Sequence, residues 1–197
     1  MNQIVECVPN FSEGNNVDII NQITATIESV PNITLLDVDS GKNTNRTVVT
    51  FIGDPSSVIE AAFLSIKKAS ILIDMNKHKG QHARMGATDV CPFIPISNVS
   101  IDECIKYTHT LAKKVSKELK IPIFLYELSA KNKKRANLAN IREGEYEGLY
   151  TKLQNKEWEP DYGYKKPHPT SGATAIGVRN FLIAYNINLN TKDKKIA

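Results

Sequence analysis

The stretch ITLLDVDSGKNTNRTVVTFIGDP, residues 33–55, contains two predicted strands and the start of a helix. Residues 33–40 and 46–53 are rich in β-branched side chains, and the polar segment between them is a predicted turn. The two strands are close enough in the sequence to pair as a hairpin. Asp54 and Pro55 then predict a helix start, with the aspartate as N-cap and the proline at the first helical position.

The segments on either side of this hairpin extend the pattern. Residues 3–9 predict a short strand, and residues 16–29 predict a helix whose apolar side chains keep helical spacing. Residues 88–96 predict a strand that its two prolines keep irregular or near a sheet edge. The order strand–helix–strand–strand–helix–strand is that of the split βαβ, or ferredoxin-like, fold. We therefore expect an α+β sandwich with a mixed or antiparallel sheet and helices packed on one face.

A further helix–strand unit extends this arrangement. Residues 101–115 carry apolar side chains at helical spacing, and residues 121–128 predict a buried strand. Residues 132–141 and 142–154 predict two short helices, and residues 158–172 form a loop rich in proline and glycine.

The domain prediction divides the chain near its end. We expect one subdomain over residues 1–180. A final strand at residues 181–189, FLIAYNINL, and a polar tail complete residues 181–197.

The composition is that of an ordinary globular chain. Its 197 residues are 41% hydrophobic and 23% charged, with a formal net charge of +4. This charge is too balanced for a nucleic-acid partner. Cys7, Cys91 and Cys104 lie among apolar residues, which predicts buried free thiols in a reducing compartment. There is no secretory signal and no run of the ~20 apolar residues that a membrane span needs, so we expect a cytoplasmic protein.

The loop KHKGQHARMG, residues 77–86, contains two histidines. His78 and His82 are four residues apart, but Gly80 argues against a shared helix face and no H-E-x-x-H motif is present, so we expect no metal site. The pattern alone favours solvated loop histidines. An acid–base role for His82 is the alternative, because imidazole titrates near neutral pH. Arg84 is suited to hold a carboxylate through paired hydrogen bonds.

Other polar segments also allow two interpretations. Asp39 belongs to the polar hairpin and is either part of ordinary turn chemistry or a carboxylate that stabilises a nearby imidazole. Asn10 either caps a helix or lines a pocket. The loop at residues 163–172 either connects two elements or holds an anionic planar ligand, with Tyr164 available for stacking.

Four segments together resemble the formiminotransferase family, in uninterrupted order from Gln3 to Leu189. They are VECVPNFSEG (5–14), LLDVDSGKNTNRTV (35–48), LIDMNKHKGQHARMGATDVCPFIPI (72–96) and FLIAYNINL (181–189). The family transfers a formimino group from N-formimino-L-glutamate to N5 of tetrahydrofolate, in histidine degradation. The resemblance therefore implies a glutamate formimidoyltransferase, with tetrahydrofolate as co-substrate and no metal.

The resemblance also implies roles for particular residues. The family's catalytic histidine corresponds to His82 in HARMGA. In the mechanism that we expect for this histidine, the carboxylate of Asp39 would stabilise the positive charge on the reacting carbon. Arg84 or Arg46 would clamp a glutamate carboxylate, and Asn10 would line the pocket. The folate-binding loop corresponds to Gly163, Tyr164, Lys165, Lys166, Pro167, His168, Pro169, Thr170, Ser171 and Gly172.

The family's fold has two ferredoxin-like subdomains facing each other, with folate bound between them. This chain resembles the first subdomain, so the expected partners are the two small-molecule substrates and a C-terminal subdomain or partner chain, with a homodimer as a further expectation. The alternative function is a non-catalytic folate-binding or dimerisation module.

Overall fold

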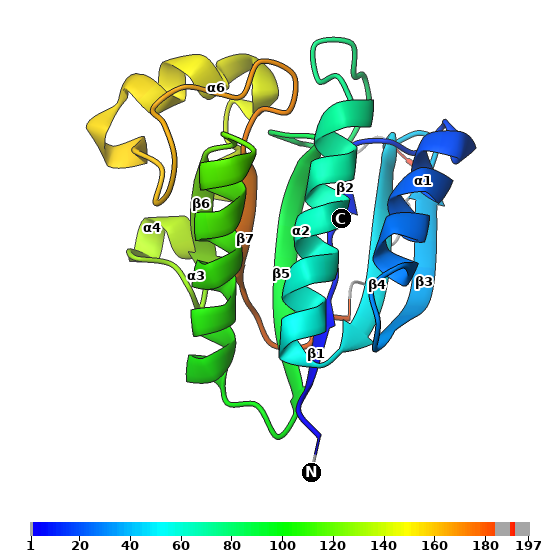
Figure 1. Cartoon of the computed structure of the whole chain (residues 1–197). Helices are drawn as coiled ribbons and strands as arrows, with labels where there is room; N and C mark the ends of the chain where they lie inside the picture. The colour runs from blue at the N-terminus through cyan, green and yellow to red at the C-terminus, as the bar shows by residue number, and fades with distance from the viewer. Residues whose placement is uncertain (1, 184–189, 192–197) are drawn as a thin grey trace.

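The computed structural model describes residues 2–183 and 190–191, which build an α+β fold around one seven-stranded sheet (Figure 1). The strands are β1 (Ile4–Cys7), β2 (Asn10–Phe11), β3 (Ile33–Gly41), β4 (Arg46–Gly53), β5 (Thr88–Ser97), β6 (Ile123–Glu127) and β7 (Thr174–Val178). The long helices are α1 (Val17–Glu28), α2 (Pro55–Leu72) and α3 (Ile101–Glu118). The shorter ones are α4 (Lys133–Ala136), α5 (Leu138–Arg142), α6 (Glu145–Gln154) and the 3-10 helix η1 (Lys156–Trp158).

The pairing of the first strands confirms the predicted ferredoxin-like order. β1 and β2 act as one interrupted strand, because both pair antiparallel with β4 on one side and with β5 on the other. β3 pairs antiparallel with the outer edge of β4, as the hairpin prediction requires. The added unit continues the sheet beyond β5, where β7 lies parallel between β5 and β6.

The edge position that was one alternative for β5 is wrong, because β5 lies inside the sheet with seven of its ten residues buried. Its prolines are tolerated where the pairing is irregular. Pro92 lies opposite the interruption between β1 and β2, and its carbonyl accepts a hydrogen bond from the Val8 N–H at 3.1 Å. Pro95 adjoins a shift in the β1–β5 register.

One face of the sheet carries the three long helices and the main core (Figure 1). Asp54 caps α2 as predicted, since its carboxylate accepts a hydrogen bond from the Ser57 N–H at 3.0 Å. Cys7, Cys91 and Cys104 are free and buried in this core, which confirms the predicted buried thiols.

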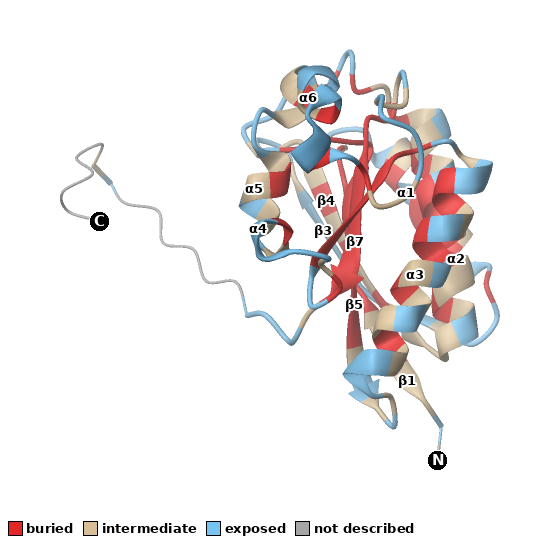
Figure 2. Cartoon of the chain, turned by 90° about the vertical axis from the view of Figure 1, so that its left-hand side faces the viewer, coloured by how far each residue is buried: buried red, intermediate tan, exposed pale blue. Residues whose placement is uncertain are grey.

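Among the described residues, the opposite face is covered only on the side of the sheet where β6 lies. There α4, α5 and α6 lie on the side of the sheet away from the three long helices (Figure 2), and α4 and α5 contact β6. A second apolar cluster packs between these helices and the sheet and includes Phe124, Leu149 and Trp158. Most of β3 is exposed. The part of this face formed by β3, β4 and β1/β2 is called the open face below.

Two features near the C-terminus differ from the sequence prediction. β7, Thr174–Val178, was not predicted, because all five residues are buried and lack the alternation that identifies a half-exposed strand. The final strand was expected at residues 181–189. Phe181, Leu182 and Ile183 are exposed and form no strand, and residues 184–189 lie outside the described part of the chain. None of the described helices is long and apolar enough to cross a membrane.

Candidate active site

The loop between α2 and β5, which carries His82, is tied to two segments that are distant in the sequence. On one side, the Gln81 N–H donates to the Asn43 carbonyl at 3.1 Å, at the tip of the β3–β4 hairpin. Gly80 is required there, because a Cβ atom would lie 2.3 Å from the Thr44 carbonyl oxygen. On the other side, the Ala87 N–H donates to the Ser171 carbonyl at 3.0 Å. Three of the polar segments selected from the sequence therefore meet at one end of the sheet.

His82 is linked to two other residues predicted for the site: it contacts Arg46 directly, and Arg46 is hydrogen-bonded to Asn10. Its Nε2 lies 2.9 Å from Nη1 of Arg46, the first residue of β4. The same Nη1 donates to Oδ1 of Asn10, in β2, at 3.0 Å. Nδ1 of His82 lies 2.6 Å from the carbonyl oxygen of Ala83. His82, Arg46 and Asn10 thus converge beside the open face.

Asp39 lies on the same face, further from the imidazole. It pairs with Val48 of β4, and Val48 pairs with Asn10, so the three residues form one row across the sheet. Two strand spacings of about 4.8 Å put Asp39 roughly 10 Å from Asn10. This position allows Asp39 to act on the site through its charge, without a hydrogen bond.

The electrostatic surroundings favour a neutral imidazole. Burial lowers the pKa of His82, and the positive charges of Arg46 and Arg142 lower it further, against smaller opposing effects of the Ala83 carbonyl and Asp89. Burial, followed by the charge of Arg142, likewise lowers the pKa of Arg46. His82 is therefore available as a base at neutral pH.

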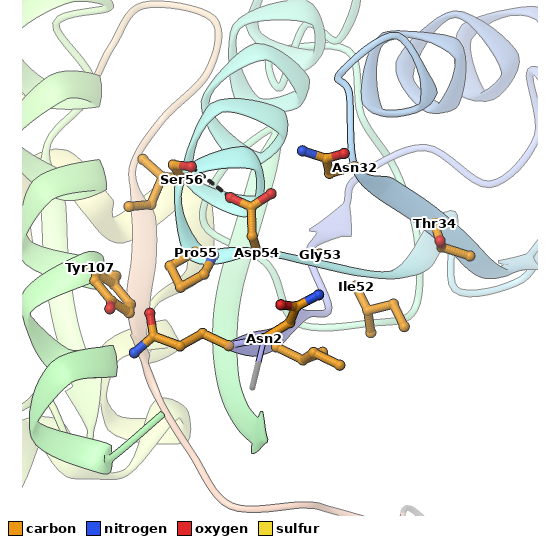
Figure 3. Close-up of a pocket in the computed structure, with 12 residues that line it drawn as sticks. Asn2, Asn32, Thr34, Ile52, Gly53, Asp54, Pro55, Ser56 and Tyr107 are labelled. Atoms are coloured by element: carbon orange, nitrogen blue, oxygen red, sulfur yellow. Dashed lines mark hydrogen bonds between the residues drawn. The ribbon is translucent and has the colours of Figure 1, made fainter. Parts of the chain in front are cut away.

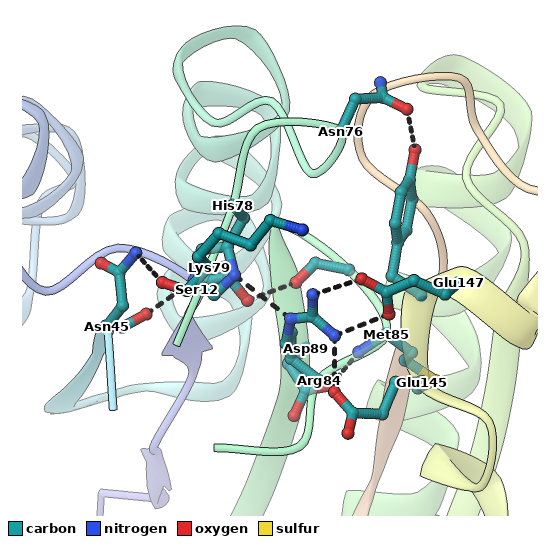
Figure 4. A network of polar contacts seen from close by, with 12 residues as sticks. Ser12, Asn45, Asn76, His78, Lys79, Arg84, Met85, Asp89, Glu145 and Glu147 are labelled. Atoms are coloured by element: carbon teal, nitrogen blue, oxygen red, sulfur yellow. Dashed lines mark hydrogen bonds and ion pairs between the residues drawn. The ribbon is translucent and has the colours of Figure 1, made fainter. Parts of the chain in front are cut away.

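Arg84 is directed toward Glu145 and Glu147 of α6 (Figure 4). Its side chain is buried, and its Nη1 and Nη2 donate to the two carboxylate oxygens of Glu147 at 2.9 and 2.7 Å. Glu145 accepts a further hydrogen bond from Nη1. These two carboxylates occupy the guanidinium group that the sequence suggested for a substrate carboxylate.

The prediction that His78 is solvated is wrong. Only 7% of this residue is exposed, and its Nε2 lies 2.8 Å from the Asn45 carbonyl oxygen. Its Nδ1 accepts a hydrogen bond from Nε of Arg84 at 3.2 Å. Arg84 is hydrogen-bonded both to His78 and to Glu147 of α6. His78 therefore has a structural role in the loop.

A buried ion pair below the HARMGA turn was not predicted from the sequence. Asp89, 1% exposed, accepts a hydrogen bond from the Met85 N–H at 2.8 Å, and its other oxygen accepts from Nε of Arg142 at 2.8 Å. An aspartate at the start of an apolar strand was the available signal for this site. Nothing local identified Arg142, which lies 53 residues away in the sequence.

The loop Gly163–Gly172 lies at the same end of the sheet. Gly172 has φ +66°, and a Cβ atom there would lie 2.1 Å from the Met85 carbonyl oxygen, so the close approach to the His82 loop requires glycine. Tyr164 is exposed, and Lys165 pairs with Glu159 at 3.0 Å.

The middle of this loop borders a hollow of about 470 Å³. Its lining includes Lys166, Pro167, His168 and Pro169 from the loop. Its other lining residues are Lys79 from the His82 loop, Tyr146, Glu147 and Tyr150 from α6, and Met75 and Asn76. Cationic and aromatic groups thus gather beside the candidate loop.

A hollow of about 880 Å³ lies at the far end of β4, away from these residues (Figure 3). Its lining includes Asn2, Asp54 and Tyr107, and no residue that the sequence suggested for the site. The Asp54 carboxylate there is engaged in capping α2. Among residues 2–183 and 190–191, no group of three or more His, Cys, Asp or Glu side chains is placed to hold a metal ion.

The fold and the site together define an α+β subdomain with a neutral histidine beside an open sheet face. The family model described as "Formiminotransferase domain, N-terminal subdomain" matches residues 4–179. The chain therefore belongs to the formiminotransferase N-terminal subdomain family.

Curated relatives share about half of the chain's residues. Glutamate formimidoyltransferase of Streptococcus pyogenes serotype M1 is 51% identical over 197 residues, which is 100% of this chain and 66% of the relative. Formimidoyltransferase-cyclodeaminase of Rattus norvegicus is 52% identical over 195 residues, 98% of this chain and 36% of the relative. Glutamate formimidoyltransferase of Thermoplasma acidophilum is 44% identical, over 98% of this chain and 64% of the relative. The chain thus spans about two thirds of the shorter relatives and about a third of the longer one.

Proposed function

We propose that this chain is the N-terminal part of a glutamate formimidoyltransferase, which moves a formimino group from N-formimino-L-glutamate to N5 of tetrahydrofolate. The observation that carries the proposal is His82, an imidazole with a lowered pKa whose Nε2 contacts Arg46, which in turn binds Asn10, at the open face. The named activity of relatives that share about half of the residues supplies the reaction.

His82 performs the proton transfers in this proposal. Nε2 takes the proton of the attacking amine as a carbon–nitrogen bond forms to the formimino carbon. The same nitrogen returns a proton to the glutamate nitrogen as the old carbon–nitrogen bond breaks. One proton is thus moved and one bond exchanged, with no change of oxidation state. The carboxylate of Asp39 stabilises the positive charge on the reacting carbon from the neighbouring strand.

Arg46 is better placed than Arg84 to bind the glutamate carboxylate. The guanidinium of Arg84 already binds the carboxylates of Glu145 and Glu147. Arg46 uses Nη1 for His82 and Asn10 and lies on the open face.

The loop Gly163–Gly172 would hold the folate. Its exposed Tyr164 offers a stacking surface, and the adjoining hollow of about 470 Å³ is lined by Lys79 and Lys166 among other residues. These groups fit an aromatic ligand with an anionic tail. Lys165 and Lys166 would favour polyglutamylated over monoglutamylated folate, a preference that their replacement by glutamate tests.

A second subdomain would cover the open face. The relatives are longer than this chain, and β3, β4 and β1/β2 present polar and apolar groups that the described part of the chain leaves uncovered. Covering this face would exclude water and strengthen the electrostatic interactions of His82. The proposed location of the protein is the cytoplasm, and the proposed pathway is histidine degradation. A non-catalytic folate-binding or dimerisation module is the alternative.

The test is an assay with formiminoglutamate and tetrahydrofolate, with the chain alone and with a separately supplied second subdomain. We expect turnover when both parts are present, and a loss of about 10²–10⁴-fold in His82→Gln. His109→Gln is the matched control, because His109 lies on α3 and binds the Tyr162 hydroxyl at 2.7 Å. Folate binding without turnover in both mixtures would support the non-catalytic alternative, and full activity of folded His82→Gln would refute the assigned role.

A further inference from the structure

A series of polar contacts on both ring nitrogens of His82 determines which of them carries the hydrogen. At one end, Nδ2 of Asn10 donates to the Val8 carbonyl at 2.9 Å, which directs Oδ1 toward Arg46. Nη1 of Arg46 then donates to Oδ1 of Asn10 and reaches Nε2 of His82. At the other end, Nδ1 of His82 meets the Ala83 carbonyl oxygen.

The donors and acceptors in this series of contacts allow only one position for the hydrogen on the imidazole. A guanidinium group only donates hydrogen bonds, so Nε2 of His82 must present its lone pair to Arg46. A carbonyl oxygen only accepts, so Nδ1 must carry the hydrogen. The imidazole is therefore neutral, with its proton on Nδ1 and its basic nitrogen toward the open face.

Charged groups from four elements act on this site. Arg46 from β4 and Arg142 from α5 are positive, and both oppose a positive charge on His82. Asp89 from β5 is negative but is paired with Arg142. Asp39 from β3 acts on Arg46. Arg46 is the positive group in direct contact with the imidazole, at 2.9 Å.

We propose that Arg46 is a positioning residue for His82: it holds the imidazole in the Nδ1–H tautomer with Nε2 as the base, and its charge opposes protonation of that nitrogen. The mechanistic meaning of this inference rests on the proposed function.

Two consequences follow for proton transfer. Nε2 accepts a proton only when a substrate N–H replaces the Arg46 N–H as its hydrogen-bond donor, so the base is exposed by substrate binding. Once Nε2 is protonated, the adjacent guanidinium makes the imidazolium a stronger acid, which promotes release of the proton to the departing nitrogen. Arg46 therefore keeps Nε2 unprotonated before the reaction and promotes release of the proton in the second transfer.

The test is an NMR titration of the substrate-free chain with ¹⁵N-labelled histidine, assigned with His82→Gln. In the wild-type chain above its pKa, we expect His82 signals of the Nδ1–H tautomer. In Arg46→Gln, we expect the proton-dissociation constant of His82 to fall by about tenfold, because the adjacent charge is removed, and the tautomers to mix. Arg46→Lys retains the charge and should shift this constant less.

Two controls accompany the titration. Lys117→Gln removes an exposed positive charge from α3 and should leave His82 unchanged, and the His109 signals report whether each variant is folded. An Nε2–H tautomer in the wild-type chain would overturn the proposal without any variant. An unchanged His82 titration in folded Arg46→Gln would also overturn it. Because no substrate is present, these outcomes are independent of whether the chain transfers a formimino group.

Discussion

Replacement of Asp89 by asparagine tests the buried ion pair that supports the candidate active site. Asp89→Asn keeps the size of the side chain, and Oδ1 still accepts the Met85 N–H. It removes the negative charge that faces Arg142 and puts an amide N–H₂ group toward the guanidinium donors. The change therefore isolates the charge pair from packing.

The structure predicts a large loss of stability. The Asp89 side chain is 1% exposed and the Arg142 side chain 16% exposed, so the mutation leaves a mostly buried positive charge without its partner. Removing one partner of a buried pair costs about 3–5 kcal/mol. Because Arg142 keeps some contact with water, we expect about 3 kcal/mol. This loss is a large share of the roughly 5–15 kcal/mol that stabilises a typical domain.

Urea denaturation followed by circular dichroism measures the change in the free energy of unfolding. Glu157→Gln is the matched control. It breaks the exposed Lys134–Glu157 pair, whose side chains are 48% and 55% exposed, and should cost about 0–1 kcal/mol. In Asp89→Asn/Arg142→Met the unpaired charge is gone, so the double variant should lose less stability than the two single losses added together.

A loss below about 1 kcal/mol in Asp89→Asn would refute this reasoning, since an exposed pair would account for such a value. Strict additivity in the double variant would also contradict it, because the two residues would then not be coupled.

Three further predictions concern the same end of the sheet. Burial lowers the pKa of His82 below 6.5, so as pH falls the unfolded chain binds a proton at this histidine before the folded chain does. The wild-type chain should therefore lose stability relative to His82→Gln as pH falls below 6.5. The same pH dependence of the unfolding free energy in both chains would contradict this. Hydrogen bonds from Arg84 lower the pKa of Glu147 from 4.5 to about 2. Glu147→Gln should therefore be less stable than the wild type above pH 4.5, and this difference in stability should disappear as pH falls toward 2. Thermal unfolding at a series of pH values measures it. Gly172→Ala should cost about 1–3 kcal/mol through its left-handed backbone alone, with a further loss from contact with the Met85 carbonyl; a neutral effect on urea denaturation would argue against the close approach.

Much of the fold was predictable because its signals lie between neighbouring residues. Asp54 and Pro55 identify the start of α2 through a cap and a fixed backbone angle, and the β-branched run of residues 46–53 coincides with β4. The order of these elements then led to the ferredoxin-like pairing. β7 escaped prediction, because a strand buried on both faces resembles any other short apolar run.

The candidate site divides in the same way. The motif around His82 was recognisable in the sequence, and its catalytic role stays a prediction. The partners of the loop were decided by tertiary structure: Arg84 binds Glu145 and Glu147, which lie 61 and 63 residues further along the chain. His78 is buried by the same tertiary packing and accepts a hydrogen bond from Arg84.

The sequence by itself determined the three long helices, most of the strands and the histidine-bearing loop, because caps, periodicity and turn residues act over a few positions. Only the tertiary structure decided that Arg46 faces Nε2 of His82 and that Asp89 pairs with Arg142. The physical reason is that hydrogen bonds and buried charges depend on distances of about 3 Å between strands and helices. Those distances exist only after the sheet has brought residues far apart in the chain together.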